Sequence, residues 1–249
     1  MNFTTIKNKN PYLNVTHQEM TCDDRICEDI APLSSYTARY VLVGPPGSGK
    51  TNFLLSVLSK NKKKGKRIGL AKVFNHVIIL SPSLSTIKNN KIFDSLDSEK
   101  KFTTFDDEFL EFVIAFTDET SAENETTLVI MDDVTSQLKK SQTLVRKLGY
   151  LLQNSRHRLL STMILSQRFI DLPTVVRETS THLVLFRSNN RRELEYIKNE
   201  IIPLDKKILQ PFLDWVYDKP YNFLFIDMSL KNNTSKFLYY KNFDLIAGI

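Results

Sequence analysis

The sequence predicts an α/β fold in which a mostly parallel central sheet carries helices on both faces. Short apolar segments with the length of buried strands alternate with segments of helical period, a pattern typical of the crossover units that build parallel sheets. A glycine-rich segment joins the first of these strands to the first helix. The composition, 41% hydrophobic and 25% charged, excludes collagen-like, coiled-coil and wholly disordered chains.

The predicted elements follow one another without an internal repeat. Strands are expected at Tyr40–Val43, Val77–Ser81, Leu128–Met131, Thr162–Ser166 and Leu183–Arg187, and two more in the tail at Phe223–Ile226 and Lys236–Tyr240. Helices are expected at Thr51–Ser59, Asp106–Phe116, Leu138–Leu152 and Asp205–Tyr217. Residues 1–35 lack periodicity and are interpreted as an irregular arm. Residues 36–249 are expected to form one domain, with a C-terminal extension from about residue 190.

The charged residues are unevenly distributed around a net charge of +6. Segment 30–93 has eleven basic residues and no acidic one, segment 94–133 has thirteen acidic and two basic residues, and segment 139–192 has eleven basic and two acidic residues. Such blocks predict distinct charged faces, and the basic ones are compatible with an anionic partner. The longest apolar runs are far shorter than the ~20 residues that cross a bilayer, so no membrane span is expected.

The glycine-rich segment matches the phosphate-loop pattern G-x-x-x-x-G-K-[ST], or Walker A, in full. A strand precedes it and a helix follows it, so that backbone N–H groups and the helix N-terminus can bind phosphates. Lys50 is expected to reach the β- and γ-phosphates, and Thr51 to bind Mg²⁺ through its hydroxyl. The predicted nucleotide contacts are Gly44, Pro45, Pro46, Gly47, Ser48, Gly49, Lys50, Thr51 and Asn52.

A later apolar strand ends in two carboxylates, as a Walker B segment does. Asp132 is expected to hold Mg²⁺ through water, and Asp133 to orient or polarise the water that attacks the γ-phosphate. The second carboxylate favours hydrolysis over simple nucleotide binding. Together the two segments predict a P-loop NTPase of the RecA-like (ASCE) class that takes ATP and Mg²⁺.

Further polar residues flank the strand expected at 162–166. Gln167 follows its carboxyl end, where parallel sheets bind ligands, and is placed to sense the γ-phosphate or the attacking water. Arg156 and Arg158 precede its amino end, far from the phosphates of their own chain. An arginine there can act as a trans finger on a neighbouring subunit's nucleotide. It can equally be a favourable cation at a helix C-terminus, and both interpretations stay open.

These segments, in this order, resemble the genome-packaging ATPases of large double-stranded DNA viruses, virophages and polinton-like elements, within the FtsK/HerA superfamily. The resemblance rests on the phosphate loop, the strand ending in Asp-Asp, the Arg-His pair and the strand ending in Gln, and it covers roughly residues 38–190. Segments 172–177 and 181–187 are also similar to that family. Two positions depart from it, since Asp133 stands where the wider superfamily usually has Glu, and Ser155 stands where Gly is expected.

The resemblance implies an ATP-driven motor that translocates double-stranded DNA into a preformed capsid. It implies a ring of identical subunits (a pentamer or hexamer), a capsid or vertex protein as partner, and a location in the host cytoplasm, in the viral factory and the virion. By position, it implies roles for Lys50 and Thr51 with nucleotide and magnesium, Asp132 with the metal, Asp133 in catalysis, Gln167 as sensor and one of Arg156 and Arg158 as the finger.

Two basic clusters are candidates for contact with the DNA backbone. Segment 60–67 places six cations in eight residues directly after the phosphate-loop helix, and a solvated lysine-rich loop is the alternative interpretation. Arg187, Arg191 and Arg192 form the second candidate. No recognition-helix pattern is evident, so DNA contacts are expected to be independent of base sequence.

Two other functions stay open. One is a related FtsK/HerA-type DNA pump or helicase, although no extra helicase or membrane domain is evident, and strand displacement on a forked duplex tests it. The other is a nucleotide-switched capsid-assembly factor, in which the arm and the tail serve as docking elements. A small-molecule kinase is disfavoured because no lid segment is recognised.

Overall fold

The computed structural model describes residues 32–33, 36–58, 61–63, 66–68, 70–82, 96–202, 204–229 and 237–247. Its strands are β1 (Arg39–Val43), β2 (Asn61–Lys63), β3 (Lys66–Ile68), β4 (His76–Leu80), β5 (Lys101–Phe102), β6 (Thr127–Asp132), β7 (Leu160–Ser166), β8 (His182–Phe186), β9 (Phe223–Asp227), β10 (Leu238–Lys241) and β11 (Asp244–Leu245). Its α-helices are α1 (Lys50–Leu58), α2 (Leu70–Val73), α4 (Asp107–Ala122), α5 (Thr135–Lys140), α6 (Gln142–Gln153), α7 (Thr174–Thr179), α8 (Arg191–Tyr196) and α9 (Lys206–Val216). A 3-10 helix covers Ser98–Lys100 and a π-helix Ile197–Ile201.

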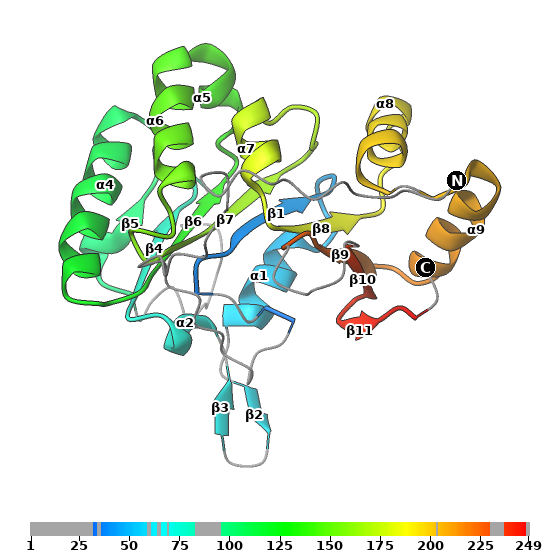
Figure 1. Ribbon diagram of the computed structural model, residues 1–249, viewed down its shortest axis with the longest axis horizontal. Coiled ribbons are helices and arrows are strands. Elements are labelled where there is room, and N and C mark those ends of the chain that lie inside the picture. The colour runs from blue at the N-terminus through cyan, green and yellow to red at the C-terminus, as the bar shows by residue number, and fades with distance from the viewer. Residues whose placement is uncertain are drawn as a thin grey trace, which may run out of the picture.

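Within the described residues, nine strands form one sheet in the order β11-β10-β9-β8-β1-β7-β6-β4-β5 (Figure 1). From β8 to β5 every pairing is parallel, whereas β9, β10 and β11 add antiparallel strands at the other side. The prediction of a mostly parallel central sheet is therefore confirmed. β7 lies between β1, which leads into the phosphate loop, and β6, which ends in the paired carboxylates.

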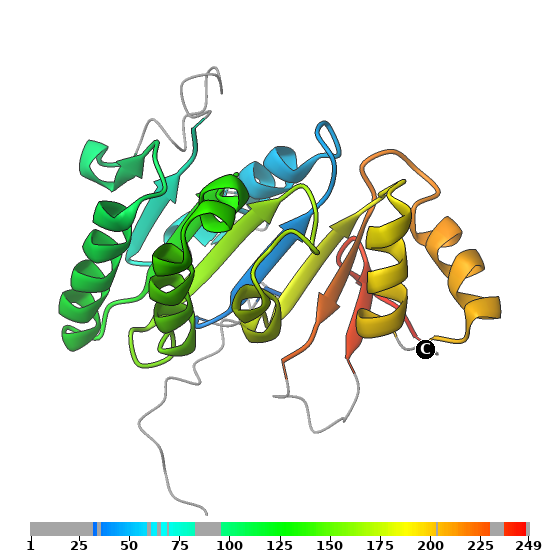
Figure 2. The ribbon, with the colours of Figure 1, turned by 90° about the horizontal axis from the view of Figure 1, so that it is seen from above.

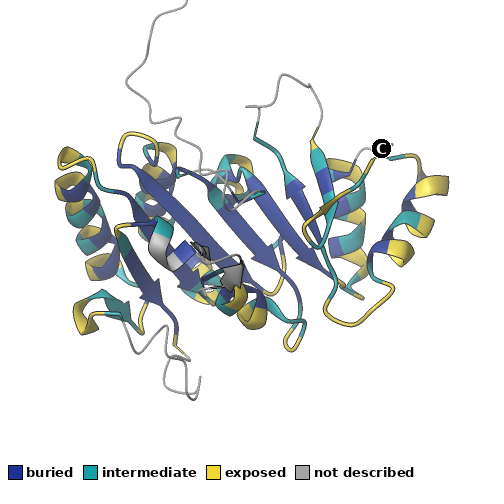
Figure 3. Cartoon of the chain, turned by 90° about the horizontal axis from the view of Figure 1, so that it is seen from below, coloured by how far each residue is buried: buried dark blue, intermediate teal, exposed yellow. Residues whose placement is uncertain are grey.

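Helices cover both faces of the sheet, as predicted (Figure 2). α4, α5, α6, α7 and α9 pack on one face, and α1 and α2 pack on the other. Because successive strand residues point to opposite faces, β1 sends Val41 and Val43 into the first core and Tyr40 and Leu42 into the second. Figure 3 shows the consequence, since the central strands are buried along their length while the outer faces of the helices are exposed.

Most predicted elements form within one or two residues of their expected bounds, and two helices differ. The helix expected at 138–152 is broken at Ser141, which ends α5 and caps α6 by accepting a hydrogen bond of 3.3 Å from the backbone N–H of Leu144. A serine hydroxyl competes with helical hydrogen bonds and favours such a start. The helix expected at 106–116 continues to Ala122, with Asp106 as its N-cap.

The tail forms the helix and the two strands that the sequence predicts. α9 begins after its N-cap Asp205, and β9 and β10 pair antiparallel and extend the sheet beyond β8. The N-terminal arm expected at 1–35 lies outside the described residues, except for residues 32–33. Among the described helices, none combines the length and the apolarity that a membrane span requires.

The basic run 60–67 contributes two short strands instead of an irregular loop. β2 and β3 pair antiparallel, with position 62 opposite 67 and position 63 opposite 66, and this hairpin projects from the body of the domain (Figure 1).

The acidic and basic blocks of the sequence contact each other between two helices. Lys147 on α6 forms ion pairs with Asp107 at 2.6 Å and Glu111 at 2.7 Å on α4. The blocks therefore partly neutralise each other across these helices.

Candidate nucleotide-binding and catalytic site

The phosphate loop has the backbone shape that its glycines allow. Gly47 and Gly49 have φ angles of +75° and +107°, which residues with a Cβ rarely adopt. Gly44 is restricted in another way, since a Cβ there would lie 2.5 Å from Ser48 Oγ and 2.7 Å from Phe186 Cβ. The loop therefore needs glycine for its turns at two positions and for close packing at the third.

Lys50, the first residue of α1, folds back onto the loop. Its Nζ donates hydrogen bonds of 2.6 Å to the Gly44 carbonyl and 3.1 Å to the Pro45 carbonyl. Burial lowers the pKa of the Lys50 ammonium, while the nearby charges of Asp132 and Asp133 act in the opposite direction. The ammonium thus lies in the curve of the loop and within electrostatic reach of both carboxylates.

Asp132 ends β6 beside this ammonium. Ser81, which follows β4, donates a hydrogen bond of 3.1 Å to Asp132 Oδ2. Burial raises the pKa of the Asp132 carboxyl, and the charge of Asp133 adds to this, whereas the Ser81 hydrogen bond and Lys50 lower it. Asp133 is exposed and has a φ of +56°, an unusual conformation that directs the chain away from the strand.

The donor set suits a small hard cation. Thr51 is exposed in the first turn of α1, and its hydroxyl with the Asp132 carboxylate offers oxygen ligands of the kind that Mg²⁺ takes alongside phosphate oxygens and water. Asn52, next in that turn, is also exposed. No group of three or more His, Cys, Asp or Glu side chains that could hold a metal alone occurs among the described residues. A metal here would take its remaining ligands from phosphate oxygens and water.

The end of β7 joins the two segments. Ser166 pairs with Val43 in the parallel register, and its carbonyl accepts a hydrogen bond of 3.2 Å from the Gly44 N–H. Its hydroxyl lies 3.2 Å from Thr135 Oγ1, just after the paired carboxylates. Gln167 follows and is exposed at the same edge of the sheet. The structure thus brings the phosphate loop, Asp132, Asp133 and Gln167 to one edge.

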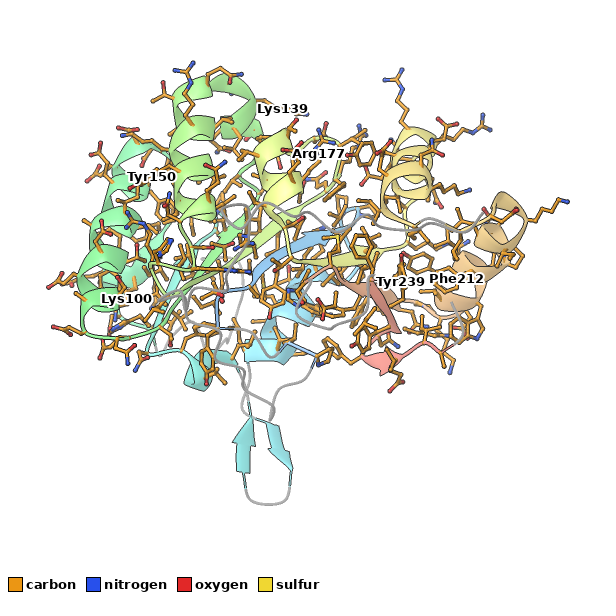
Figure 4. The ribbon with its side chains drawn as sticks, viewed as in Figure 1. Lys100, Lys139, Tyr150, Arg177, Phe212 and Tyr239 are labelled. Carbon is orange, nitrogen blue, oxygen red and sulfur yellow. The ribbon has the colours of Figure 1, made fainter. Side chains whose placement is uncertain are left out.

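The two candidate finger arginines, which the sequence treats alike, lie in different environments. Arg158 is only 6% exposed, and its Nη1 donates a hydrogen bond of 2.9 Å to the Ile114 carbonyl on α4. It also pairs with Asp118 and lies over the ring of Tyr150, 5.4 Å from the ring centroid. Figure 4 labels this tyrosine on α6. Arg156 is exposed and forms no ion pair with the described residues. Arg158 is therefore bound within its own chain, whereas Arg156 makes no ion pair with the part of the chain that the structure describes.

Arg156 lies at the opposite edge of the sheet from the phosphate loop. It lines a cavity of about 610 Å³ with Arg39, Glu178 and residues near Thr179. Arg39 donates to the Thr179 carbonyl and, at 2.7 Å, to the hydroxyl of Ser155. Burial lowers the pKa of Arg39, and the charge of Arg156 lowers it further. Ser155, which stands where glycine is expected, thus provides a buried hydroxyl that accepts a hydrogen bond from Arg39.

A cavity of about 380 Å³ adjoins the phosphate loop on the side away from Asp132. Its other walls are Arg187 and the loop 217–222 between α9 and β9. Tyr221 has a φ of +66°, is 67% exposed, and its Cδ1 would lie 3.3 Å from a Cβ placed on Gly49. Nothing in the sequence points to Tyr221, because a tail loop without a motif gives no signal that it packs against the phosphate loop. Arg187 is expected from the sequence only as a DNA contact.

The chain is similar in sequence to known viral proteins. A family model described as "Poxvirus A32 protein" matches residues 29–244. DNA packaging protein OPG160 of Variola virus is 32% identical over 159 residues, which cover 59% of this chain and 52% of that protein. The chain thus spans about half the length of the curated relatives it matches.

Solved structures share the fold. The DNA-packaging ATPase B204 of Sulfolobus turreted icosahedral virus matches with a TM-score of 0.57 at 18% identity, over 82% of this chain and 97% of that one. The genome-packaging NTPase B204 of Sulfolobus turreted icosahedral virus 2, in complex with ATP-gammaS, matches with a TM-score of 0.52 at 21% identity, over 85% of this chain and 100% of that one. The prediction of a P-loop NTPase fold is therefore confirmed.

Proposed function

Because the chain belongs to the poxvirus A32 protein family, we propose that it is an ATPase that drives double-stranded DNA into a preformed capsid. The observation that carries this proposal is the meeting of the phosphate loop, Asp132, Asp133 and Gln167 at one edge of the sheet, with the exposed Arg156 at the opposite edge. The first set suits hydrolysis, and the separation suits an assembly of several subunits.

ATP is the proposed cofactor, held by its phosphates. The backbone N–H groups of the loop and the N-terminus of α1 supply donors for them, and Lys50 exchanges its contacts with the Gly44 and Pro45 carbonyls for phosphate oxygens. Thr51, through its hydroxyl, and Asp132, through water, would hold Mg²⁺, and the ion would neutralise charge on the β- and γ-phosphates. The γ-phosphate lies on the side of Asp132, where β6 and β7 end.

The nucleoside then leaves the loop on the other side, toward β8 and β9. The cavity of about 380 Å³ beside Tyr221 is the proposed site of ribose and base. The exposed tyrosine ring offers a face on which a base can stack, and Asn52 lies in the adjacent turn of α1.

Hydrolysis needs a water aligned with the γ-phosphate. Asp133 is the proposed group that orients or polarises this water, and Gln167 the proposed sensor of the γ-phosphate. Asp133 is exposed at the end of β6 and one position beyond the Asp132 carboxylate, and Gln167 is exposed at the end of the adjacent strand β7. Both side chains are free to act at the same side of the nucleotide.

Arg156 is the proposed trans finger. A phosphate loop on one edge and a cationic cavity on the other are unlike surfaces, and head-to-tail contacts between unlike surfaces form a ring when the rotation between subunits closes. In such a ring, pentameric or hexameric, the cavity beside Arg39 and Arg156 receives the neighbour's anionic γ-phosphate. Arg158 instead supports the turn that carries Arg156, because its guanidinium is bound to α4.

DNA contacts are proposed to be made to the phosphate backbone. The β2–β3 hairpin, whose sequence belongs to the basic run 60–67, projects from the domain, and Arg187, Arg191 and Arg192 are exposed. Neither surface has the form of a recognition helix in a groove, so binding is expected to be independent of sequence and strongly salt-dependent. A capsid or vertex protein completes the proposed assembly, which works in the host cytoplasm, in the viral factory and the virion.

The direct test is ATP hydrolysis by the purified chain with and without linear duplex DNA. Duplex DNA is expected to raise the rate, and Lys50→Ala to abolish hydrolysis with or without DNA. A rate that does not respond to duplex DNA would argue for the nucleotide-switched assembly factor, which would also keep particle assembly in Asp133→Asn. Strand displacement on a forked duplex would argue for a related helicase.

A further inference from the structure

Glu193 is a buried carboxylate that the proposed chemistry does not use. Its side chain, on α8, is 1% exposed and forms no ion pair with the described residues. Its two oxygens accept backbone hydrogen bonds, Oε1 from the Phe169 N–H at 2.6 Å and Oε2 from the Ile170 N–H at 3.3 Å. Burying a charge without a cation is costly unless hydrogen bonds stabilise it. The two backbone hydrogen bonds provide this stabilisation and fix the position of the carboxylate.

The two N–H groups belong to the segment 167–170, here called the sensor loop, which begins at Gln167. The start of this loop is fixed by Ser166, whose hydroxyl donates to the Arg168 carbonyl at 2.8 Å and accepts from the Arg168 N–H at 3.2 Å. The end of the loop is fixed by Glu193. Two sets of hydrogen bonds, here called clamps, therefore hold the sensor loop that begins at Gln167. The first clamp is Ser166 at the end of β7, and the second is Glu193 on α8.

The second clamp ties the sensor loop to a helix with an exposed cationic face. Asn190 caps α8 by accepting a hydrogen bond of 3.1 Å from the Glu193 N–H, which fixes the first turn of the helix. The rings of Phe169 and Tyr196 pack at 5.8 Å and make a second contact between the loop and α8. Arg191 and Arg192 stand exposed in the same turn as Glu193. A shift of the sensor loop would therefore shift the first turn of α8, which carries Arg191 and Arg192.

We propose that Glu193 is a positioning residue that sets the sensor loop for hydrolysis and couples it to α8. The inference rests on the proposed ATPase function. In this account the carboxylate acts through Gln167 and touches no substrate. It also provides the connection through which DNA at Arg191 and Arg192 changes the rate of hydrolysis.

Glu193→Gln tests the proposal with little change in shape. An amide has one acceptor oxygen, and its NH₂ group would face one of the two N–H groups that the carboxylate now binds. The expected result is a fall in kcat of about 10- to 100-fold, the scale of a small misplacement in an active site, with KM for ATP nearly unchanged. Amide hydrogen exchange at Phe169 and Ile170 is expected to accelerate. Glu195→Gln, on the exposed side of α8, is the matched control and is expected to change neither.

A double-mutant cycle shows whether Glu193 acts through Gln167. If it does, Glu193→Gln has little further effect on kcat once Gln167→Ala is present, and it lowers the ratio of DNA-stimulated to basal rate in the wild-type background. Multiplicative effects on kcat, or an unchanged rate with unchanged exchange at Phe169 and Ile170, would overturn the proposal. An inactive wild-type chain would instead refute the ATPase function, and hydrogen exchange would still report whether the clamp exists.

Discussion

The Gly44 N–H donates a hydrogen bond of 3.2 Å to the Ser166 carbonyl, so the phosphate loop is joined through the main chain to the end of the strand that precedes Gln167. The two residues are 122 positions apart and meet because β1 and β7 are parallel neighbours in register. The groups that would hold the phosphates and the group that would sense the γ-phosphate are therefore linked by a direct main-chain hydrogen bond.

Replacing Gly44 is expected to disturb this junction. In Gly44→Ala the new Cβ would lie 2.5 Å from Ser48 Oγ and 2.7 Å from Phe186 Cβ, so the loop or β8 must shift. The expected loss of stability is about 1–3 kcal/mol, the usual cost of overpacking, measured by denaturant unfolding. Gly47→Ala is the comparison, because nothing lies within 4 Å of its Cβ and only its φ of +75° is unfavourable. Equal stability of Gly44→Ala and wild type would contradict the packing described here.

Asp132 is expected to make the nucleotide-free protein less stable as the pH rises. Burial raises the pKa of its carboxyl in the folded state, so the folded state binds more protons than the unfolded state above the ordinary pKa. Stability then falls as the pH rises from about 4 until the folded-state pKa is passed. Asp132→Asn removes this loss, so thermal melts should show a stabilisation that grows with pH, while Mg²⁺-dependent hydrolysis disappears.

Ser81→Ala provides the matched change for this prediction. It removes the hydrogen bond of 3.1 Å that the Ser81 hydroxyl donates to Asp132, which raises the pKa of that carboxyl further. The pH dependence of the melting temperature should then become steeper than in wild type. A flat pH response in both the wild type and Ser81→Ala would mean that Asp132 is not desolvated.

Substitutions at Arg156 and Arg158 are expected to differ in their effect on stability, because only Arg158 is buried. Arg158→Met removes the Arg158 donor from the Ile114 carbonyl, which keeps the Thr117 hydroxyl as a donor at 3.1 Å, and it leaves Asp118 without its ion-pair partner. The expected cost is about 2 kcal/mol in the free energy of unfolding. Arg156→Ala removes an exposed side chain and should unfold like wild type, within about 0.5 kcal/mol. Unfolding by urea at neutral pH measures both. A destabilised Arg156→Ala variant would show that this arginine has a structural partner.

Tyr221 is expected to affect the nucleoside and not the phosphates. In Tyr221→Ala the affinity for ATP should fall by about 10-fold, because stacking of a base on an aromatic ring contributes about 1–3 kcal/mol. The affinity for inorganic tripolyphosphate should stay unchanged, and Tyr221→Phe should bind ATP like wild type. Calorimetric titrations of the three proteins compare them. Equal losses for ATP and tripolyphosphate would mean that the substitution damages the phosphate loop instead.

Much of this site could be predicted from the sequence, because its parts are contiguous. The phosphate loop, the strand ending in Asp132 and Asp133, and the strand ending in Gln167 each combine an apolar strand with a polar end, and the parallel sheet then aligns those ends. The strands β9 and β10 are expected from the sequence, but no feature of the sequence indicates that β9, β10 and β11 pair antiparallel.

Contacts between distant segments could not be predicted. The sequence around Glu193 does not indicate that its carboxylate binds the sensor loop. The sequence around Tyr221 does not indicate that its ring lies beside Gly49. Arg156 and Arg158 are two positions apart, and the sequence does not say which of them is buried against α4. Tertiary packing decides all of these roles.

Mixing two inactive variants shows whether Arg156 acts on a neighbouring subunit's nucleotide in a ring ATPase. Arg156→Ala keeps Asp133, and Asp133→Asn keeps Arg156, so each alone should fail to hydrolyse ATP on linear duplex DNA. In an equal mixture, about one quarter of the interfaces should combine an intact Asp133 with an intact Arg156 from the adjacent subunit. The mixture is therefore expected to regain DNA-stimulated hydrolysis. A mixture no more active than the two variants measured separately would contradict this role of Arg156.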